Sequence, residues 1–182
     1  MALDNLFAQL DNHLTGEEKG MPPVDKWAPE YCGEIDLVIK QNGDWFYMGT
    51  PFKRLSLVKL FASVLRKDSE EYFLVTPVEK VKIQVEDVPF IITRWQWQDD
   101  KAHSTMILAT NLGDEFPLSE EHPLSISEDG TLYVTVRRNL RAKVHRNVYY
   151  QWIEQALQRD TAEQGTEVYF ESAGNSIVIG YC

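Results

Sequence analysis

Apolar residues recur in two rhythms along the chain, and these rhythms predict most of its elements. Near the start, Leu3, Leu6, Phe7, Leu10 and Leu14 follow helical spacing, which predicts an amphipathic helix over residues 3–14. From residue 34 onward, short runs alternate apolar with polar residues, as half-buried strands do. We expect strands at residues 34–40, 45–49, 72–76, 80–85, 90–98, 104–110, 124–127, 131–136, 167–171 and 176–181.

Two further helices are predicted, each following a hairpin. The first hairpin turns at Asn42-Gly43, a strong short-range hairpin signal, and its helix is expected to begin at Ser56 as the N-cap. Its apolar stripe consists of Leu57, Leu60, Phe61, Val64 and Leu65. The second helix is predicted over residues 141–158, and its inward positions are Val144, Val148, Trp152 and Ile153.

The two hairpin-and-helix stretches resemble each other. Placing Gly43 on Gly130 without a gap also places Phe46 on Tyr133 and Arg54 on Arg141. A chance match between two such stretches is one explanation, and an internal duplication is the other. Duplication predicts an α+β fold with a mostly antiparallel sheet, built from two repeated strand-hairpin/helix units. We expect a helix and linker at 1–30, one repeat at 31–113 and a second at 114–182.

Charge narrows the classes of partner. The formal net charge of −10 over 182 residues argues against general DNA or RNA binding, which needs an excess of Lys and Arg.

The N-terminus lacks the features of a secretory signal, and no apolar run approaches membrane-spanning length, so we expect a soluble, cytoplasmic protein that does not bind membranes. The four His and two Cys are scattered, which argues against a structural zinc site, and no cofactor fingerprint is present.

A basic stretch stands out against this acidic background. Residues 137–146 contain five Lys or Arg and no acidic residue, and Lys53 and Arg54 form a second basic pair. Side chains of this kind near the start of a helix favour a phosphate or carboxylate site. The alternative is a solvated charged face whose Arg stems cover apolar surface.

Several motifs resemble the bacterial family catalogued as domain of unknown function 1285. They are Trp27-Ala28-Pro29, Cys32-Gly33, Gly43-Asp44-Trp45-Phe46-Tyr47, Gly49-Thr50-Pro51, Leu74-Val75-Thr76-Pro77-Val78-Glu79, Val85-Glu86-Asp87-Val88-Pro89-Phe90, Val134-Thr135-Val136-Arg137 and Arg146-Asn147-Val148-Tyr149-Tyr150. The resemblance implies a duplicated α+β core whose C-terminal half is loosely similar to pleckstrin-homology-like folds. It also implies a pocket for a nucleotide-like ligand between the halves and a signalling role, without an established catalytic activity. The family pattern has an acidic residue where this chain has Arg141, so Arg141 is left out of the expected site.

The sequence therefore predicts a cytoplasmic signalling protein that binds a phosphate-bearing, nucleotide-like small molecule between its two repeats. Arg54, Arg137 and Arg146 would hold the anion, and Tyr47 and Tyr150 would stack against or orient the organic part. One alternative is a protein-interaction adaptor with no small-molecule ligand. Another is an enzyme with Glu79 or Asp87 as its base, although nothing in the spacing of these acids indicates catalysis.

Overall fold

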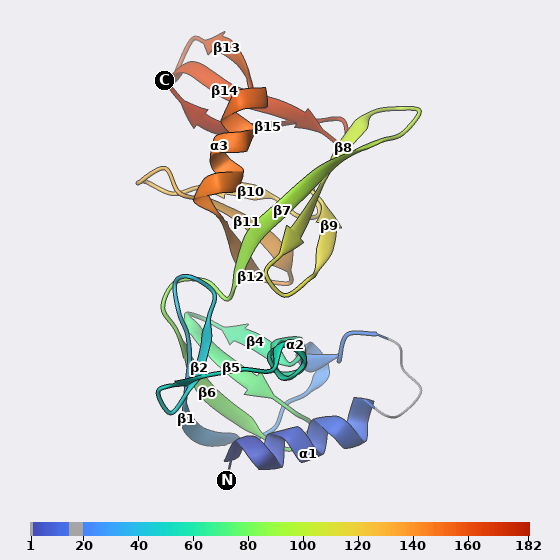
Figure 1. Ribbon diagram of the computed structural model, residues 1–182, viewed down its shortest axis with the longest axis vertical. Coiled ribbons are helices and arrows are strands. Elements are labelled where there is room, and N and C mark those ends of the chain that lie inside the picture. Colours follow the sequence, from blue (N-terminus) through green and yellow to red (C-terminus); the bar gives the residue numbers. More distant parts are fainter. Residues whose placement is uncertain (1, 15–19) are drawn as a thin grey trace. The chain divides into compact units, whose positions relative to one another are not determined.

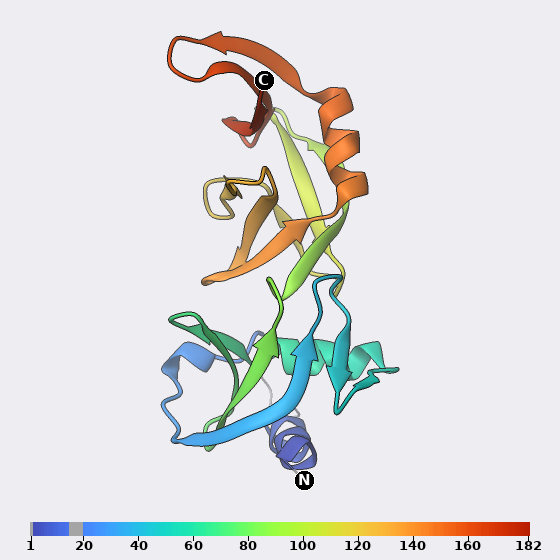
Figure 2. The ribbon, with the colours of Figure 1, turned by 90° about the vertical axis from the view of Figure 1, so that its left-hand side faces the viewer.

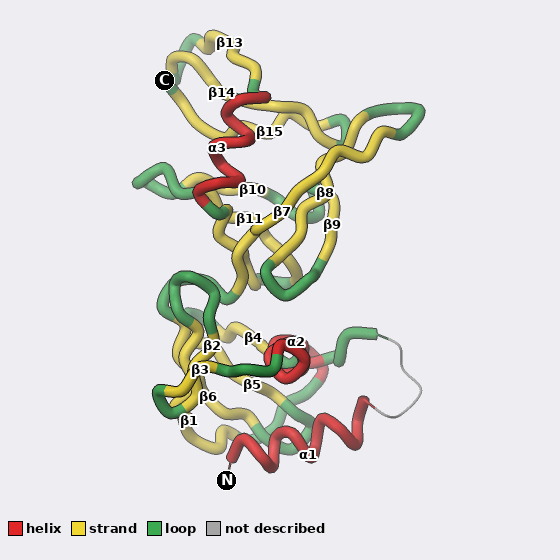
Figure 3. Tube along the Cα trace, viewed as in Figure 1, coloured by secondary structure: helices red, strands yellow, loops and turns green. Residues whose placement is uncertain are grey.

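The computed structural model describes residues 2–14 and 20–182, which form two compact units, Met1–Asp87 and Val88–Cys182. Each unit is built on a six-stranded sheet. Figures 1 and 3 show the strands and helices of both units. The division at Asp87 lies earlier in the chain than the boundary expected after residue 113. The earlier position follows from strand pairing, because residues 90–99 and 104–110 pair with strands of the second unit.

The sheet of unit 1 consists of two three-stranded meanders. The elements of unit 1 are α1 (Ala2–Leu14), the 3-10 helix η1 (Val24–Lys26), β1 (Tyr31–Ile39), β2 (Trp45–Tyr47), β3 (Thr50–Pro51), α2 (Leu55–Ser63), β4 (Leu65–Asp68), β5 (Glu71–Val75) and β6 (Lys80–Val85). The strand order is β3-β2-β1-β6-β5-β4, and only the central pair, β1 with β6, is parallel among the described ladders of this sheet.

Unit 2 repeats this plan and adds a second, smaller sheet. Its elements are β7 (Phe90–Asp99), β8 (Ser104–Thr110), β9 (Glu115–Pro117), β10 (Leu124–Ile126), β11 (Leu132–Arg137), β12 (Leu140–Val144), α3 (Arg146–Gln155), β13 (Leu157–Thr161), β14 (Gly165–Ser172) and β15 (Asn175–Tyr181). The six-stranded sheet has the order β10-β11-β12-β7-β8-β9, with β12 and β7 parallel, and the three-stranded sheet has the order β13-β14-β15.

The two units share one topology, which confirms the α+β duplication. In each, the first and last of six strands form the central parallel pair and a meander extends on either side. A backbone hydrogen bond just after the last strand of each sheet also recurs. Glu86 N donates to Ile39 O in unit 1 and His145 N donates to Ile92 O in unit 2, both at 3.0 Å. The curled sheet of unit 2 agrees with the pleckstrin-homology-like resemblance.

The equivalence between the units differs from the one proposed from sequence. The shared topology makes the β1–β2 hairpin equivalent to β7–β8, whereas placing Gly43 on Gly130 pairs it with β10–β11. The helices differ as well, since α2 lies between the two meanders of unit 1 and α3 follows both meanders of unit 2. A hairpin followed by a helix therefore occurs in each unit, at positions that the duplication does not relate.

The predicted helix over residues 141–158 is wrong at both ends. Leu140, Ala142 and Val144 are buried on one face of β12 while Arg141 and Lys143 point to the other, an alternation that fits a strand. The helix begins only at Arg146, and residues from Leu157 form β13. The first helix likewise starts at Leu55 with Arg54 as its N-cap, and Leu65 belongs to β4.

Helix α1 packs against the rest of unit 1 through the apolar stripe that the sequence shows. Leu6 and Leu10 are fully buried, and Gln9 between them donates to Glu79 Oε2 at 3.0 Å and accepts from the Thr76 hydroxyl at 2.6 Å. Residues 15–19 of the predicted linker lie outside the described residues. No helix in the described part of the chain is long and apolar enough to span a bilayer.

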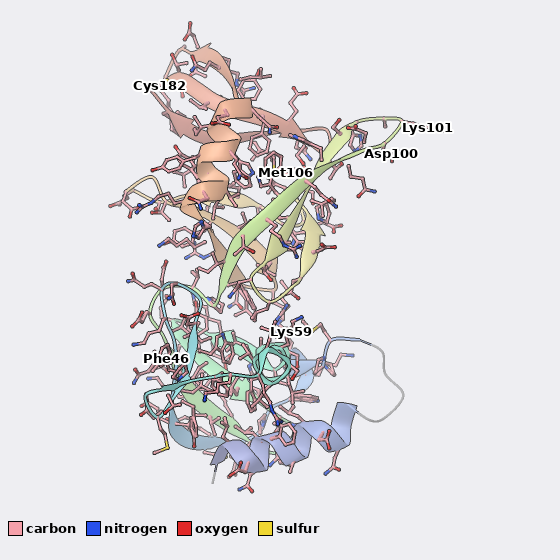
Figure 4. All side chains as sticks on the ribbon, in the orientation of Figure 1. Phe46, Lys59, Asp100, Lys101, Met106 and Cys182 are labelled. Atoms are coloured by element: carbon pink, nitrogen blue, oxygen red, sulfur yellow. The ribbon has the colours of Figure 1, made fainter. Side chains whose placement is uncertain are left out.

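Helix α3 is held against β7 in unit 2, as the two ribbon views show. The indole of Trp95 donates to Gln151 at 2.7 Å, and that of Trp97 donates to Gln155 at 2.8 Å. Trp152, on the same helix, is fully buried beside Phe170. The β7–β8 hairpin continues beyond this contact, and Figure 4 places Asp100 and Lys101 at its tip.

Candidate anion-binding pocket

A pocket of about 320 Å³ lies in unit 2 where the β10–β11 turn, the end of β12 and the start of α3 meet. It is lined by Asp129, Gly130, Thr131, Leu132, Lys143, Val144, Arg146, Tyr149 and Tyr150. Two cations and two aromatic rings thus share one small concave surface. The volume suits a small ligand, since such sites typically measure about 300–1,000 Å³.

The first wall is a tight turn over residues 127–131. Gly130 N donates to Ser127 O and Ser127 N donates to Thr131 O, each at 2.9 Å. Gly130 occupies the left-handed region with φ +83°, which glycine adopts without the steric strain of a Cβ atom. The turn places the backbone of Gly130 and Thr131 at the edge of the pocket.

Asp129 belongs to this turn through its side chain. Its carboxylate accepts hydrogen bonds from the Ser127 hydroxyl and, at 3.0 Å, from Thr131 N. These bonds, led by the one from Ser127, lower the pKa of Asp129 to about 2. Asp129 is therefore an anion at neutral pH, and the basic side of the pocket is formed by other residues.

That basic side comes from the end of β12 and the start of α3. Lys143 lies on the same outward face as Arg141, whose guanidinium stacks 4.7 Å from the Tyr133 ring centroid. The Arg146 side chain is exposed at the first position of α3. His145 caps the helix by accepting from Asn147 N at 3.1 Å. The basic residues of the pocket lining are Lys143 and Arg146.

Tyr149 and Tyr150 supply the aromatic surface. Their ring centroids lie 6.2 Å apart with an interplanar angle of 52°. Tyr150 is 57% exposed, whereas Tyr149 is half-buried. Exposed rings of this kind stack on flat organic groups, and their hydroxyl groups can donate to or accept from a polar ligand.

Of the five residues predicted to bind ligand, the pocket includes Arg146 and Tyr150. Arg137 lies at the other end of the β11–β12 hairpin, where it pairs with Leu140 in the ladder. Its Nη1 atom donates to Asp114 Oδ1 at 3.1 Å, and its guanidinium lies 4.8 Å from the Phe90 ring centroid. Burial lowers the pKa of Arg137, while the Asp114 carboxylate raises it.

The other two predicted ligand residues belong to unit 1. Arg54 is exposed at the N-cap of α2, and its side chain makes no capping hydrogen bond. Tyr47 is half-buried in β2, where its ring lies 6.5 Å from that of Phe52. The role of these two residues in ligand binding stays a prediction.

The other seven of the nine lining residues were not predicted to bind ligand, and Lys143 and Tyr149 are the most important of them for the chemistry of the pocket. Lys143 was part of the basic stretch, but the helix predicted from residue 141 obscured its position on a strand. The alternation of Leu140, Ala142 and Val144 is the sequence signal that places Lys143 on the outward face of a strand, next to the start of α3.

Glu79, one of the two acids weighed as a catalytic base, has a structural partner. Glu79 is half-buried and accepts from Gln9 of α1, which ties that helix to the β5–β6 turn. Among the residues that the structure describes, no group of three or more His, Cys, Asp and Glu is arranged to hold a metal ion.

Two family models together match most of the chain. The model for the N-terminal domain of a domain of unknown function, DUF1285, matches residues 22–88, and the model for the C-terminal domain of the DUF1285 protein of unknown function matches residues 89–178. The chain belongs to the DUF1285 family. The boundary between the two DUF1285 models coincides, within one residue, with the boundary between the two structural units.

Two crystal structures of DUF1285 proteins are similar to this chain. The protein from Silicibacter pomeroyi DSS-3 is 30% identical, with a TM-score of 0.79, over 96% of this chain and 93% of that one. The protein from Shewanella baltica OS155 is 34% identical, with a TM-score of 0.53, over 65% of this chain and 91% of that one. No curated protein matches the sequence.

Proposed function

We propose that this DUF1285 protein binds a phosphate-bearing small molecule in the pocket formed by the β10–β11 turn, β12 and α3. The observation that supports the proposal is the convergence of Lys143 and Arg146 on one pocket that also includes Tyr149 and Tyr150. Two cations match the charge of a phosphate, and Arg offers several donors to its oxygens. An aromatic pair beside them suits a nucleotide-like ligand, whose base would stack on a ring.

The pocket lies wholly within unit 2, so this proposal does not depend on how the two units are arranged. The negative charge of Asp129 repels a phosphate, so the phosphate would lie toward Lys143 and Arg146 and the organic part would stack on Tyr149 or Tyr150. We propose a binding and sensing role rather than catalysis. A carboxylate with a pKa of about 2 is a weak base at neutral pH, whereas an efficient general base has a pKa near the working pH.

The test is a thermal-shift screen of the purified full chain with nucleoside mono-, di- and triphosphates, cyclic dinucleotides, pyrophosphate and inorganic phosphate. A ligand at ~100 times its dissociation constant stabilises the folded protein by about 2.7 kcal/mol, which raises the melting temperature by a measurable amount. Hits would then be titrated by calorimetry. A screen in which no phosphate compound raises the melting temperature would contradict the proposal.

Variants locate the site of any hit. Arg146→Ala should weaken binding by about 10- to 150-fold, which corresponds to a charge-assisted contact of about 1.5–3 kcal/mol. Arg94→Ala, which removes an exposed Arg on β7 outside the pocket, is the matched control and should leave affinity unchanged. Arg54→Ala tests the prediction made from sequence. If Arg54→Ala abolished binding and Arg146→Ala did not, the ligand would belong in unit 1.

A further inference from the structure

A second, larger concavity of about 580 Å³ lies elsewhere in unit 2, along the three-stranded sheet. Residues of strand β15, of strand β10 and of the segment before β10 line it. The lining residues are Ser119, Glu120, Pro123, Leu124, Ile126, Asn175, Ser176, Ile177, Val178 and Tyr181. We refer to these ten residues as the β15 groove.

Strand β15 presents its edge to this groove. Side chains of a strand alternate between its two faces, yet the consecutive residues from Asn175 to Val178 all line the groove. The groove therefore follows the strand edge rather than either face. In the order β13-β14-β15, this edge is the one that β14 does not cover.

The edge of β15 has backbone groups directed away from β14. Cys182 and Thr166 exchange two hydrogen bonds, with Cys182 N donating at 2.9 Å and Thr166 N donating at 3.1 Å. In an antiparallel ladder the next residue pair has no such exchange, and its N–H and C=O groups point outward. Tyr181, opposite Glu167 in the register, is that residue, and it also lines the groove.

This edge lacks the protection that exposed strands usually have. Natural edge strands are protected by charged side chains or Pro, which prevent pairing with another chain. Strand β13, at the opposite edge of the same sheet, has Arg159 and Asp160. Strand β15 reads NSIVIGY and has no charged residue or Pro, although it lines a groove.

The walls of the groove are fixed by a buried hydroxyl. Ser172, at the end of β14, donates to Leu118 O at 2.7 Å and accepts from Met106 N at 2.9 Å. These bonds hold the β14–β15 hairpin against the segment that leads into Ser119 and Glu120. Leu124 and Ile126, on one face of β10, give the groove an aliphatic wall.

We propose that the β15 groove binds an extended segment of a partner protein, which adds as a fourth strand next to β15. Main-chain hydrogen bonds to the strand edge would provide affinity, and apolar side chains at alternate positions would contact Leu124 and Ile126. Glu120 is the only charged residue in the groove lining, so a Lys or Arg of the segment would face it. The groove is independent of the anion-binding pocket, and neither proposal requires the other.

The test begins with a displayed library of random nine-residue peptides, selected on the purified full chain. Selected peptides should alternate apolar with other residues and contain Lys or Arg. In a fluorescence anisotropy titration with the strongest synthetic peptide, Val178→Lys should weaken binding by at least about tenfold, because it places a charge at the strand edge. Leu157→Lys, at an exposed position of the opposite edge strand β13, should change affinity less than about twofold.

A second variant addresses charge without touching β15. Glu120→Lys should weaken binding of the Lys- or Arg-containing peptide about tenfold, whereas Glu128→Lys, in the β10–β11 turn outside the groove lining, should not. In ¹⁵N NMR spectra the peptide should shift the amide signals of residues 175–181. The proposal is overturned if no peptide is enriched on the wild type over Val178→Lys. It is equally overturned if sedimentation shows that a second copy of the chain occupies the groove, in a dimer that Val178→Lys dissociates.

Discussion

The Nη1 atom of Arg137 lies 3.1 Å from Oδ1 of Asp114, joining the end of β11 to the turn between β8 and β9. Both side chains are largely shielded from water, with 15% and 30% exposure, and the Arg137 guanidinium also rests against the Phe90 ring. Arg137 therefore has a structural role within unit 2, and we expect this role to dominate the effect of its substitution.

Replacement of Arg137 by Ala should lower the free energy of unfolding by about 1.5–3 kcal/mol, the usual range for a hydrogen bond to a charged group. Asp114→Asn should have an effect of the same sign, and the double variant should cost less than the sum of the two. Urea denaturation of the four proteins measures this coupling. Additive effects would mean that the pair contributes no net stability.

The unit boundary predicts which fragments fold. A chain of residues 88–182 retains every strand of the sheet order β10-β11-β12-β7-β8-β9 and should unfold cooperatively in urea. A chain of residues 114–182, which begins at the boundary expected from sequence, lacks β7 and β8. It also lacks the buried residues Phe90, Ile91 and Ile92, and it should show no cooperative transition.

Ser172 should be sensitive to the loss of a single oxygen. Ser172→Ala leaves the amide of Met106 and the carbonyl of Leu118 without this partner inside the protein, at a cost of about 1–3 kcal/mol for each buried group. Ser176→Ala, at an exposed position of β15, is the control and should remain within about 0.5 kcal/mol of the wild type. Chemical denaturation gives both values, and equal stability of the two variants would refute the role of Ser172.

Asp129 should make stability depend on pH in the acid range. Its pKa is about 2 in the folded protein against an ordinary value of 3.8, so its ionised form is favoured by folding. Its contribution is complete above about pH 4 and disappears as the pH falls toward 2. The stability difference between the wild type and Asp129→Asn should shrink over this interval. A carboxyl NMR titration that places Asp129 near its ordinary pKa would contradict the prediction.

The fold class and most strands were predictable because their signals are local. Alternation of apolar and polar residues identified long strands such as β1 and β8, and helical spacing identified α1. Short strands were missed, including β3 with two residues, because so few positions define no period. Val144 and Val148 also satisfy helical spacing, so the sequence predicts a helix across strand β12, and only strand pairing separates the two interpretations.

The match between Gly43 and Gly130 shows how local likeness differs from equivalence. Lys40 N donates to Asp44 O and Gly43 N donates to Lys40 O, and the turn that ends at Gly130 and Thr131 repeats this pattern. The two glycines have φ angles of +89° and +83°. The sequence match thus detected a shared turn type correctly. Which strands correspond between the units depends on the parallel pairing of β1 with β6 and of β7 with β12, and this pairing joins residues far apart in sequence.

For the candidate site, the basic stretch correctly indicated where positive charge concentrates, but not which side chains share a pocket. Arg137 and Arg146 lie nine positions apart in sequence, and a helix from residue 141 would have left them near each other. The β11–β12 hairpin instead places Arg137 near its turn and Arg146 beyond its opposite end. A partner such as Asp114, which lies 23 residues before Arg137, has no sequence signal that distinguishes it from a surface acid.

The central parallel pair has a consequence for how such a chain can arise. Because the first and last strands of a unit run side by side in the same direction, the chain enters the sheet at one end of this pair and leaves it at the other. A second copy of the gene segment can then follow directly, joined here by the few residues between Val85 and Phe90. No long return crossing is needed, and neither copy has to open its sheet to admit the other. A tandem arrangement of such units therefore needs only a short connection, and in unit 2 helix α3 and the three-stranded sheet follow the last strand of the six-stranded sheet without interrupting it.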